Sequence, residues 1–377
     1  MMDLPELIVL DVGHGNCAVL RDTNAVIVID CPPPGTILVE TLEVLDINVI
    51  DHILISHADI DHTGGLPSLL SKIHVRNVHI NPDASKRGPR WVEIRKAIAL
   101  HNKSGTKVHR ALGTEVSKEI NSGQVEIEIL APSLEEGLSG ASGVDRKRRK
   151  LESNSVSAVI GLIHNSHRAV LLPGDLDEVG LDNLLMDQEN IEASILIFPH
   201  HGGSANGMDN YNFARKLCSL VKPNLVIFSL ERGRLLGKNH TENPRDDIMK
   251  GVISASTDAH IMCTQLSGKC AANNPNSDFS HLSNLPALGF ASDSCCGGTI
   301  IIAINGKQTT YTPLHSSHKA FISNPEYNLM ISDISLREVQ MRDIRRYISL
   351  TNTFHNLGNW NIFPIEVKKA KNPIVST

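Results

Sequence analysis

The segment Ser56-His57-Ala58-Asp59-Ile60-Asp61-His62-Thr63-Gly64-Gly65 decides how this chain is interpreted. It places two imidazoles and two carboxylates within a few residues, and these side chains bind borderline and hard divalent cations. We expect a short buried strand over 51–55 before the segment and a helix over 66–73 after its glycines. A turn between a strand and a helix can direct several side chains toward one point. The segment therefore predicts a metal site rather than a solvated run of charges.

The composition is that of an ordinary globular protein. The 377 residues are 41% hydrophobic and 20% charged, which suits one large domain or one domain with an appendage. The net charge of −5 argues against indiscriminate binding of polyanions but permits a local basic groove. We find no signal peptide and no apolar run of transmembrane length, and the seven cysteines are an odd number. We therefore expect a reduced, cytoplasmic protein that does not bind a membrane.

A glycine motif near the start of the chain allows two interpretations. Gly13-His14-Gly15-Asn16-Cys17-Ala18 matches a dinucleotide-binding fingerprint, and Asp30 follows at a plausible distance for a ribose contact. That fold needs a full crossover helix between its strands, whereas only residues 19–24 are available here. We therefore expect hairpins instead, with strands at 7–12, 17–21 and 25–30.

Strands and helices alternate along most of the remaining chain. Further strands are expected at 49–56, 75–81, 107–111, 124–130, 156–163, 168–172, 193–198 and 225–230, and helices at 36–46, 90–102 and 178–186. Residues 132–150 are expected to be a loop that ends in a basic run, which is either a solvated surface or a clamp for a nucleic-acid backbone. The alternation with many hairpins indicates an α/β fold in which helices sandwich two mixed sheets, an αββα four-layer arrangement.

Several segments, in order, resemble the metallo-β-lactamase superfamily and, within it, the hydrolase domain of ComEC-type competence proteins. These segments are the opening motif, Leu10-Asp11-Val12-Gly13-His14-Gly15-Asn16, Val28-Ile29-Asp30, Asn154-Ser155-Val156-Ser157, Leu172-Pro173-Gly174-Asp175, Phe198-Pro199-His200-His201-Gly202-Gly203 and Lys238-Asn239-His240. The resemblance covers roughly residues 7–305. It implies a hydrolase domain over 1–312, followed by a C-terminal helical extension over 313–377.

The resemblance also implies a site for two divalent cations. The implied ligands are His57 and Asp59 for one cation, Asp61, His62 and His200 for the other, and Asp175 between them. Asp59 replaces the histidine that is usual at its position, and Asn154 and Ser155 stand where lactamase-like members carry another histidine. This makes the first site richer in oxygen, so we expect Mn²⁺ as readily as Zn²⁺.

Other polar residues of these segments are candidates for substrate contact. We expect Asn154, Asn239 and His201 to bind substrate, with His201 acting through a hydrogen bond rather than as a metal ligand. His240 would contact a phosphate or donate a proton to the leaving group, unless it is a solvated loop residue. Asp61 is the ligand on which catalysis should depend most.

Two cations held in this way would activate a bridging hydroxide, so the predicted activity is metal-dependent hydrolysis, most simply of phosphodiesters as in a nuclease. There are two alternatives: the chain hydrolyses a small ester or amide, or it binds nucleic acid without catalysis. A basic stretch around Trp91 either tracks a nucleic-acid backbone, with the indole stacking on a base, or is a solvated helix face. Its cations are Lys86, Arg87, Arg90, Arg95 and Lys96.

Two later regions depart from the family pattern. An insert at about 266–297 is rich in Asn, Ser and Pro. Its cysteines either bind a structural Zn²⁺ that stabilises the insert or are buried free thiols. The candidate zinc ligands are Cys263, Cys270, His281, Cys295 and Cys296. Residues 335–351 predict an amphipathic helix, which either packs on the domain or docks a protein partner.

Overall fold

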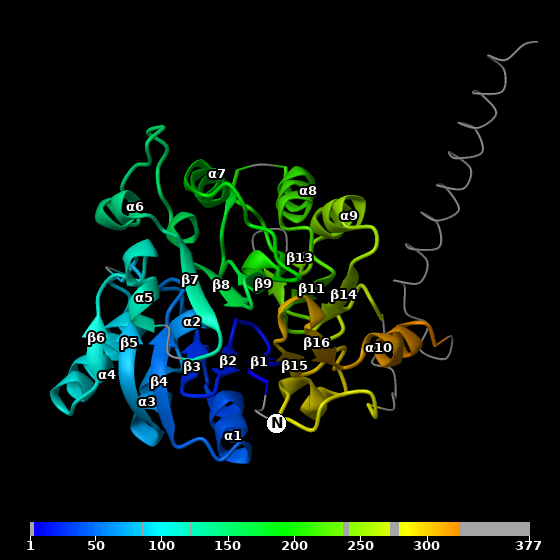
Figure 1. The fold of residues 1–377 in the computed structure, drawn as a ribbon, viewed down its shortest axis with the longest axis horizontal. Coiled ribbons are helices and arrows are strands. Elements are labelled where there is room, and N and C mark those ends of the chain that lie inside the picture. The colour runs from blue at the N-terminus through cyan, green and yellow to red at the C-terminus, as the bar shows by residue number, and fades with distance from the viewer. Residues whose placement is uncertain are drawn as a thin grey trace, which may run out of the picture. The chain divides into compact units, whose positions relative to one another are not determined.

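Two β-sheets lie at the centre of the fold, with helices on the outer face of each (Figure 1). The first sheet has eight strands in the order β16-β15-β1-β2-β3-β4-β5-β6. Their bounds are Glu6–Val9 (β1), Ala18–Arg21 (β2), Val26–Ile29 (β3), Val49–Leu54 (β4), His74–His79 (β5), Lys107–His109 (β6), Ile300–Ala303 (β15) and Thr310–Thr312 (β16). β1, β2 and β3 pair antiparallel, whereas β3 through β6 run parallel. The predicted hairpins are therefore confirmed, and the dinucleotide-binding alternative is wrong.

The second sheet has six strands in the order β14-β11-β10-β9-β8-β7. Their bounds are Glu126–Ala131 (β7), Val159–His164 (β8), His167–Leu172 (β9), Ile195–Ile197 (β10), Leu225–Phe228 (β11) and His260–Cys263 (β14). β7, β8 and β9 pair antiparallel, and β9, β10, β11 and β14 are parallel. A separate short ribbon pairs Leu235–Leu236 (β12) with Thr241–Glu242 (β13).

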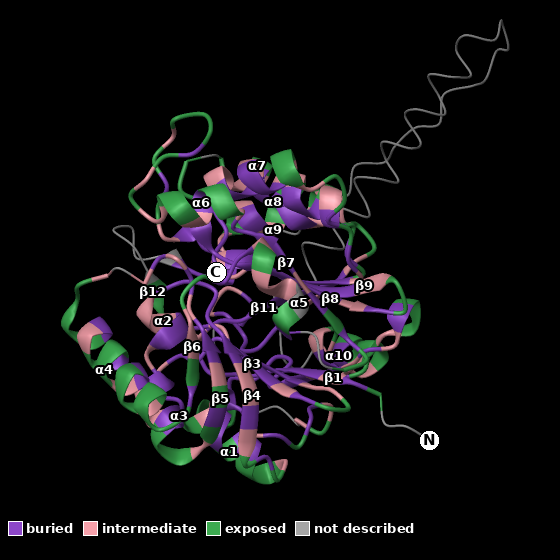
Figure 2. Cartoon of the chain, turned by 60° about the vertical axis from the view of Figure 1, so that its left-hand side comes forward, coloured by how far each residue is buried: buried purple, intermediate pink, exposed green. Residues whose placement is uncertain are grey.

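The helices flank these sheets on both sides. Their bounds are Thr36–Val44 (α1), Ile60–Thr63 (α2), Leu66–Lys72 (α3), Pro89–Lys103 (α4), Ser117–Ile120 (α5), Leu134–Ser139 (α6), Glu178–Asp187 (α7), Asn210–Val221 (α8), Asp246–Ala255 (α9) and His315–Ile322 (α10). α1, α3 and α4 lie beside the first sheet, and α7, α8 and α9 lie beside the second (Figure 2). None of the helices in the described part of the chain is long and apolar enough to cross a bilayer.

Both faces of the central strands are buried, which explains their nearly continuous hydrophobic sequences. In β1, Leu7 and Val9 pack in the core between the two sheets, whereas Ile8 packs on the opposite face, among residues of α1, α3 and α4. Strand periodicity makes this alternation unavoidable. The four-layer αββα arrangement predicted from the sequence is confirmed, and the fold is a mixed α/β fold of the metallo-β-lactamase type.

Several helices lie outside the predicted ones, among them α6, α8 and α9. α6 lies within the predicted loop 132–150 and begins at a capping box, in which Ser133 and Glu136 satisfy each other's backbone N–H groups. α8 and α9 lie outside the predicted elements, although each buries one apolar stripe, with Phe213, Leu217 and Val221 on α8. The short 3₁₀ segments are Thr114–Val116, Asn154–Val156 (η2), Pro199–Gly202 (η3), Leu288–Ser292 and Gly306–Gln308.

This computed structural model describes residues 4–84, 86–120, 123–207, 209–236, 241–271 and 279–324. The contacts divide the chain into residues 1–329 and 330–377. α10, which the sequence places in the C-terminal extension, belongs to the first of these units. The amphipathic helix predicted over 335–351, with its possible protein partner, lies outside the described residues.

Candidate metal centre

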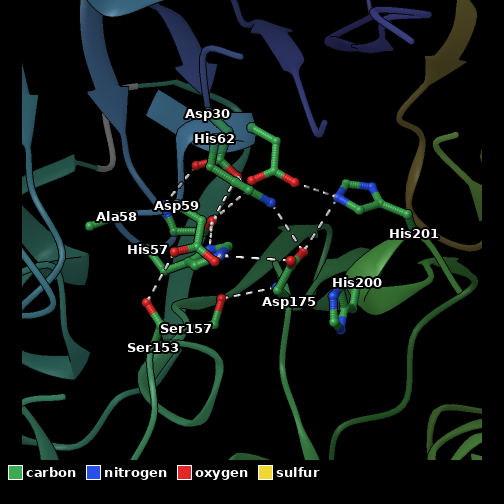
Figure 3. A network of polar contacts seen from close by, with 12 residues as sticks. Asp30, His57, Ala58, Asp59, His62, Ser153, Ser157, Asp175, His200 and His201 are labelled. Carbon is green, nitrogen blue, oxygen red and sulfur yellow. Dashed lines mark hydrogen bonds and ion pairs between the residues drawn. The ribbon is translucent and has the colours of Figure 1, made fainter. Parts of the chain in front are cut away.

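Acidic and imidazole side chains from both sheets meet at one end of the sandwich (Figure 3). Parallel strands end at the same edge of a sheet, so the segments that follow β4, β9 and β10 bring their side chains together. The converging residues are His57 and Asp59 between β4 and α2, Asp61 and His62 in α2, Asp175 after β9 and His201 in η3 after β10.

Three imidazoles of the centre are fixed through their Nδ1 atoms. Asp30 accepts a hydrogen bond from His62 Nδ1 at 2.7 Å, and the Ser229 carbonyl accepts one from His201 Nδ1 at 3.0 Å. Ser56 Oγ donates to Asp30 at 2.6 Å, so it accepts from His57 Nδ1 at 3.2 Å. These acceptors assign the proton to Nδ1 in each ring, which leaves the Nε2 lone pairs free to bind a metal.

The Nε2 atoms point toward one another with no hydrogen-bond partner of their own. Nε2 of His57, His62 and His201 and Oδ1 of Asp175 are buried and unpaired among the described residues. Burying polar atoms without partners costs free energy, so their convergence fits a site in which a cation is their partner. One atom each from Asp61, His62, Asp175 and His201 lies within 4.8 Å of the other three. Two nitrogens and two carboxylate oxygens suit a divalent cation, so the residues present fit a metal ion.

Asp175 lies between two groups of candidate ligands. Its Oδ1 is 3.1 Å from His62 Nε2 and 3.8 Å from His201 Nε2, whereas its Oδ2 is 3.7 Å from His57 Nε2. His57 Nε2 is also 3.6 Å from Asp59 Oδ2. The bridging position that the family resemblance implies for Asp175 therefore agrees with the geometry.

The backbone before Asp175 is specialised for this position. Gly174 has φ of 56°, and a Cβ there would overlap the Ser157 hydroxyl and lie 2.9 Å from the Ser56 Cβ. Ser157 Oγ in turn accepts the Asp175 backbone N–H at 3.0 Å. Asp175 is thus anchored to the segment that precedes β8.

Burial opposes protonation of His62, but Asp175 and Asp30 outweigh it and raise the pKa of His62 well above its usual range, so a cation that binds His62 Nε2 displaces a proton. Burial opposes ionisation of Asp175, but the neighbouring imidazoles of His62 and His201 outweigh it and hold its pKa well below the usual range. Burial likewise opposes ionisation of Asp61, and hydrogen bonding from His14 helps to lower its pKa. Burial and the nearby His62 lower the pKa of His57 to about 4, so that ring is neutral at pH 7.

Asp59 is held from outside the centre. Its carboxylate forms an ion pair with Lys86 and accepts a hydrogen bond from Ser153 Oγ at 3.4 Å. Burial lowers the pKa of Lys86 to about 8, partly offset by the charge of Asp175. The sequence placed Lys86 in a basic nucleic-acid stretch, whereas the structure places it beside a metal-ligand candidate.

Of the two adjacent histidines, His201 lies in the centre and His200 does not. The sequence prediction named His200 as the ligand and gave His201 a hydrogen bond to substrate, whereas the structure groups His201 with the other candidate ligands. His200 Nδ1 contacts the Ser204 carbonyl at 2.9 Å, whereas the His201 side chain is fully buried with Nε2 3.5 Å from Asp61 Oδ2. Both residues have left-handed backbone angles, with φ of 52° and 55°. Such backbone is costly for non-glycine residues, and here it turns His201 inward.

His14 is a site residue that the sequence did not single out. Its Nε2 lies 3.0 Å from Asp61 Oδ2, and its ring is 4.7 Å from that of His201. It stands between Gly13 and Gly15 in the turn after β1. A lone imidazole in a tight glycine turn at the end of a strand is the signal that pointed to it.

The remaining predicted contacts are placed as follows. Asn154 is buried at the start of η2, next to Ser153, and its role in substrate binding stays a prediction. Asn239 and His240 lie outside the described residues.

Among the described residues, the cysteines and the histidine proposed to hold a structural zinc do not meet within ligand distance of one another, although burial and the neighbouring thiols of Cys296 and Cys270 raise the pKa of Cys263. Cys295 Sγ is 3.8 Å from Asp11, Cys296 Sγ is 3.2 Å from His318 Nε2, and Cys270 Sγ accepts from Ser267 Oγ at 3.1 Å. His281 Nε2 contacts the Cys296 carbonyl at 2.9 Å rather than a thiol. Within the described ranges they do not appear together as a metal-ligand group, and all seven cysteines are free and buried, including Cys263. Buried thiols, the alternative interpretation, describe them better.

The two candidate nucleic-acid surfaces also change. Trp91 is 2% exposed and donates its Nε1–H to the Ala84 carbonyl, so it cannot stack on a base. In the basic run at 145–150, Arg146 pairs with Glu135 and Asp187, and Arg149 pairs with Asp145 and Asp182. Arg146 and Arg149 therefore already have acidic partners, and a clamp for a phosphate backbone in this run stays a prediction.

Residues 10–140 match the family model of the metallo-beta-lactamase superfamily. The chain is similar to the metallo-beta-lactamase fold protein YhfI from Bacillus subtilis, with 13% identity over 69% of this chain and 96% of that chain and a TM-score of 0.42. It is similar to Igni18, a metallo hydrolase from the hyperthermophilic archaeon Ignicoccus hospitalis, at 15% identity over 68% and 94% of the two chains and a TM-score of 0.38. A diphosphatase from the PhnP family is 12% identical over 60% and 86%, with a TM-score of 0.35. No curated protein matches this chain in sequence.

The family match covers the hairpin that carries His14 and the turn that carries His57 to His62, whereas Asp175 and His201 come from beyond it. The finer resemblance to ComEC-type proteins stays a prediction. Residues 10–140 are thus similar to the metallo-beta-lactamase superfamily, and the two-sheet fold and the cluster of metal-ligand side chains agree with that similarity.

Proposed function

We propose that this chain hydrolyses phosphodiester bonds with two divalent cations bound on either side of Asp175. The observation that carries the proposal is the convergence of unpaired, buried ligand atoms on this one carboxylate: Nε2 of His62 and His201 near Oδ1, and Nε2 of His57 near Oδ2. A carboxylate with ligands facing each oxygen can bridge two ions. Asp61 and Asp59 complete the two groups with one oxygen ligand each.

When bound, two such cations stabilise the charge on the substrate oxygens and lower the pKa of a water molecule. The protein's own part is to hold the ligands rigidly. Asp30, Ser56 and the Ser229 carbonyl orient the three rings, and Lys86 and Ser153 hold Asp59. Fixed ligands lose little entropy on binding, which favours tight and well-defined coordination.

An anionic substrate is favoured by the cationic side chains near the centre. Lys86 contacts Asp59, and Arg90 and Arg234 line the same hollow as Asp61. These charges would attract a phosphodiester, whereas a neutral ester or amide would gain nothing from them. Hydrolysis of a small ester or amide, and nucleic-acid binding without catalysis, are outcomes of the test below.

The test incubates the purified full-length protein with single- and double-stranded DNA, RNA, bis(p-nitrophenyl) phosphate and p-nitrophenyl acetate. Mn²⁺, Zn²⁺ and Mg²⁺ are added separately after chelation. Asp61→Ala removes a ligand, and Asp258→Ala, in the exposed turn before β14, is the matched control. We expect metal-dependent phosphodiester cleavage that Asp61→Ala abolishes and Asp258→Ala retains. Cleavage of the acetate alone would replace the proposal with an esterase, and binding of nucleic acid without cleavage would replace it with a binding module.

A further inference from the structure

A hollow of about 500 Å³ opens directly beside the metal centre. His14 and Asp61 line it at the centre, and Pro33 and Leu288 are among the apolar side chains of its wall. Its volume lies within the range of small-molecule pockets.

This hollow is one side from which the centre meets solvent, and the exposed side chain of Asp59 lies outside its lining. The side chains of His57, His62 and His201 are fully buried, and that of Asp175 is 3% exposed. By contrast, the side chain of Asp61 is 25% exposed. A substrate that reaches the cations on this side therefore passes the residues that line the hollow.

Two arginines line the hollow, and their charges are only partly compensated. Arg234 Nη1 lies 3.2 Å from Glu231 Oε2, in a pair whose side chains are 47% and 39% exposed. Exposed pairs of this kind are weak, so Arg234 can exchange Glu231 for a stronger acceptor. Arg90, at the start of α4, is exposed and forms no ion pair with the described residues. A guanidinium suits bidentate binding of a phosphate group.

We propose that Arg90 and Arg234 bind a second anionic group of the substrate, a phosphate adjacent to the phosphodiester at the metal centre. Pro33 and Leu288 would contact a ring of the nucleotide that lies between these two phosphates. This inference rests on the proposed phosphodiesterase function and narrows its substrate to nucleotide-like chains that carry consecutive phosphates. The second phosphate has two possible sources, a terminal phosphate or the next internucleotide phosphate, and they share the same chemistry.

The experiment compares four substrates that differ in this second anion. Bis(p-nitrophenyl) phosphate and the dinucleoside monophosphate TpT lack it, pTpT carries it as a terminal phosphate, and a long oligothymidylate carries it within the chain. The variants are Arg90→Gln and Arg234→Gln. Arg215→Gln, on the exposed face of α8, is the matched control, and thermal melting of each variant checks the fold.

We expect either arginine variant to raise KM for pTpT or the oligothymidylate on the order of tenfold, because one charge-assisted contact is lost, with kcat unchanged. The kcat/KM for bis(p-nitrophenyl) phosphate and TpT should stay at the wild-type value, as should every value for Arg215→Gln. An effect on pTpT but not on the oligothymidylate would assign the site to a terminal phosphate, and the reverse to an internal one.

Equilibrium binding to the metal-free protein gives a second readout that needs no turnover. Wild type should bind pTpT more tightly than TpT, and the arginine variants should lose this preference. Equal binding of the two dinucleotides, or an equal loss for both in the variants, would overturn the inference while the phosphodiesterase proposal stands. A wild-type protein that cleaves no phosphodiester with any of the three metals would overturn the proposed function instead.

Discussion

Asp30 Oδ2 accepts a hydrogen bond from His62 Nδ1 at 2.7 Å, and the same carboxylate accepts the backbone N–H and the hydroxyl of Ser56. Asp30 adopts a left-handed backbone with φ of 60° directly after β3. It binds no candidate cation itself but fixes the ring of one ligand and, through Ser56, that of His57.

Replacement of Asp30 by Asn should therefore weaken metal binding without removing a ligand. The amide can donate to His62 Nδ1 and so favour the tautomer that presents N–H instead of a lone pair at Nε2. We expect the affinity for Mn²⁺ or Zn²⁺ to fall about 10–100-fold. Competition with a chromophoric chelator measures it, with Asp258→Asn as control. An unchanged affinity would show that the orientation of His62 does not depend on Asp30.

The adjacent histidines of η3 allow a direct test of which ring is a ligand. His201→Ala removes a buried Nε2 of the centre and should lower cation affinity by more than about 100-fold, beyond the loss from an orienting partner. His200→Ala should keep most of the affinity, because its ring contacts the Ser204 carbonyl. Calorimetric titration of both variants with one cation compares them. The opposite order would restore His200 as the ligand.

Gly174→Ala should destabilise the fold and disturb the centre together. Its positive φ and the overlap of a new Cβ with Ser157 would cost about 1–3 kcal/mol in the free energy of unfolding. Gly88→Ala is the matched control, because a Cβ there meets nothing within 4 Å and the backbone φ is −59°. Urea unfolding of the metal-free proteins provides the measurement. Equal midpoints for Gly174→Ala and wild type would show that the turn can accept a side chain.

Buried histidines away from the centre predict a fold that weakens in acid. Burial and neighbouring histidines lower the pKa of His79 and His318 to about 3 and that of His260 to about 4. All three are thus neutral in the folded state, whereas the unfolded chain protonates them near pH 6.5. Between these values the unfolded state binds more protons, so the free energy of unfolding falls as the pH drops below about 6.5 and is unaffected by these groups above it.

Urea midpoints measured between neutral pH and the onset of acid unfolding check this expectation. His79→Asn removes one titrating ring and should flatten the decline, because fewer protons are taken up on unfolding. His74→Asn, at the exposed start of the same strand β5, should leave the decline as in wild type. A His79→Asn protein with the same pH dependence as wild type would contradict the assignment.

Hydrophobic periodicity and local motifs predicted the strands, because the pattern of a strand is set by residues that are close in the sequence. The runs that became β1, β4, β9 and β11 are apolar enough on both faces to show as buried strands. α8 was missed although Phe213, Leu217 and Val221 recur at helical spacing, so its buried face could have been predicted from the sequence.

The sequence predicted which types of residue form the metal centre more accurately than it predicted which positions supply them. His57, Asp59, Asp61, His62 and Asp175 are brought together as expected. The choice between His200 and His201 depends on two left-handed residues in succession, which sequence patterns do not predict. His14 contacts Asp61 across the end of the sandwich, and local spacing does not predict that partner, although the glycine turn marks the position of His14.

Asp175 joins loops that belong to opposite halves of the sandwich, with Ser157 and His201 on one side and His62 on the other. A cation held there contacts ligands from both halves, so it binds the folded state and not the unfolded chain. Heat denaturation should then report how much of the protein has bound a cation. The melting temperature should rise with the logarithm of the free cation concentration once that concentration exceeds Kd.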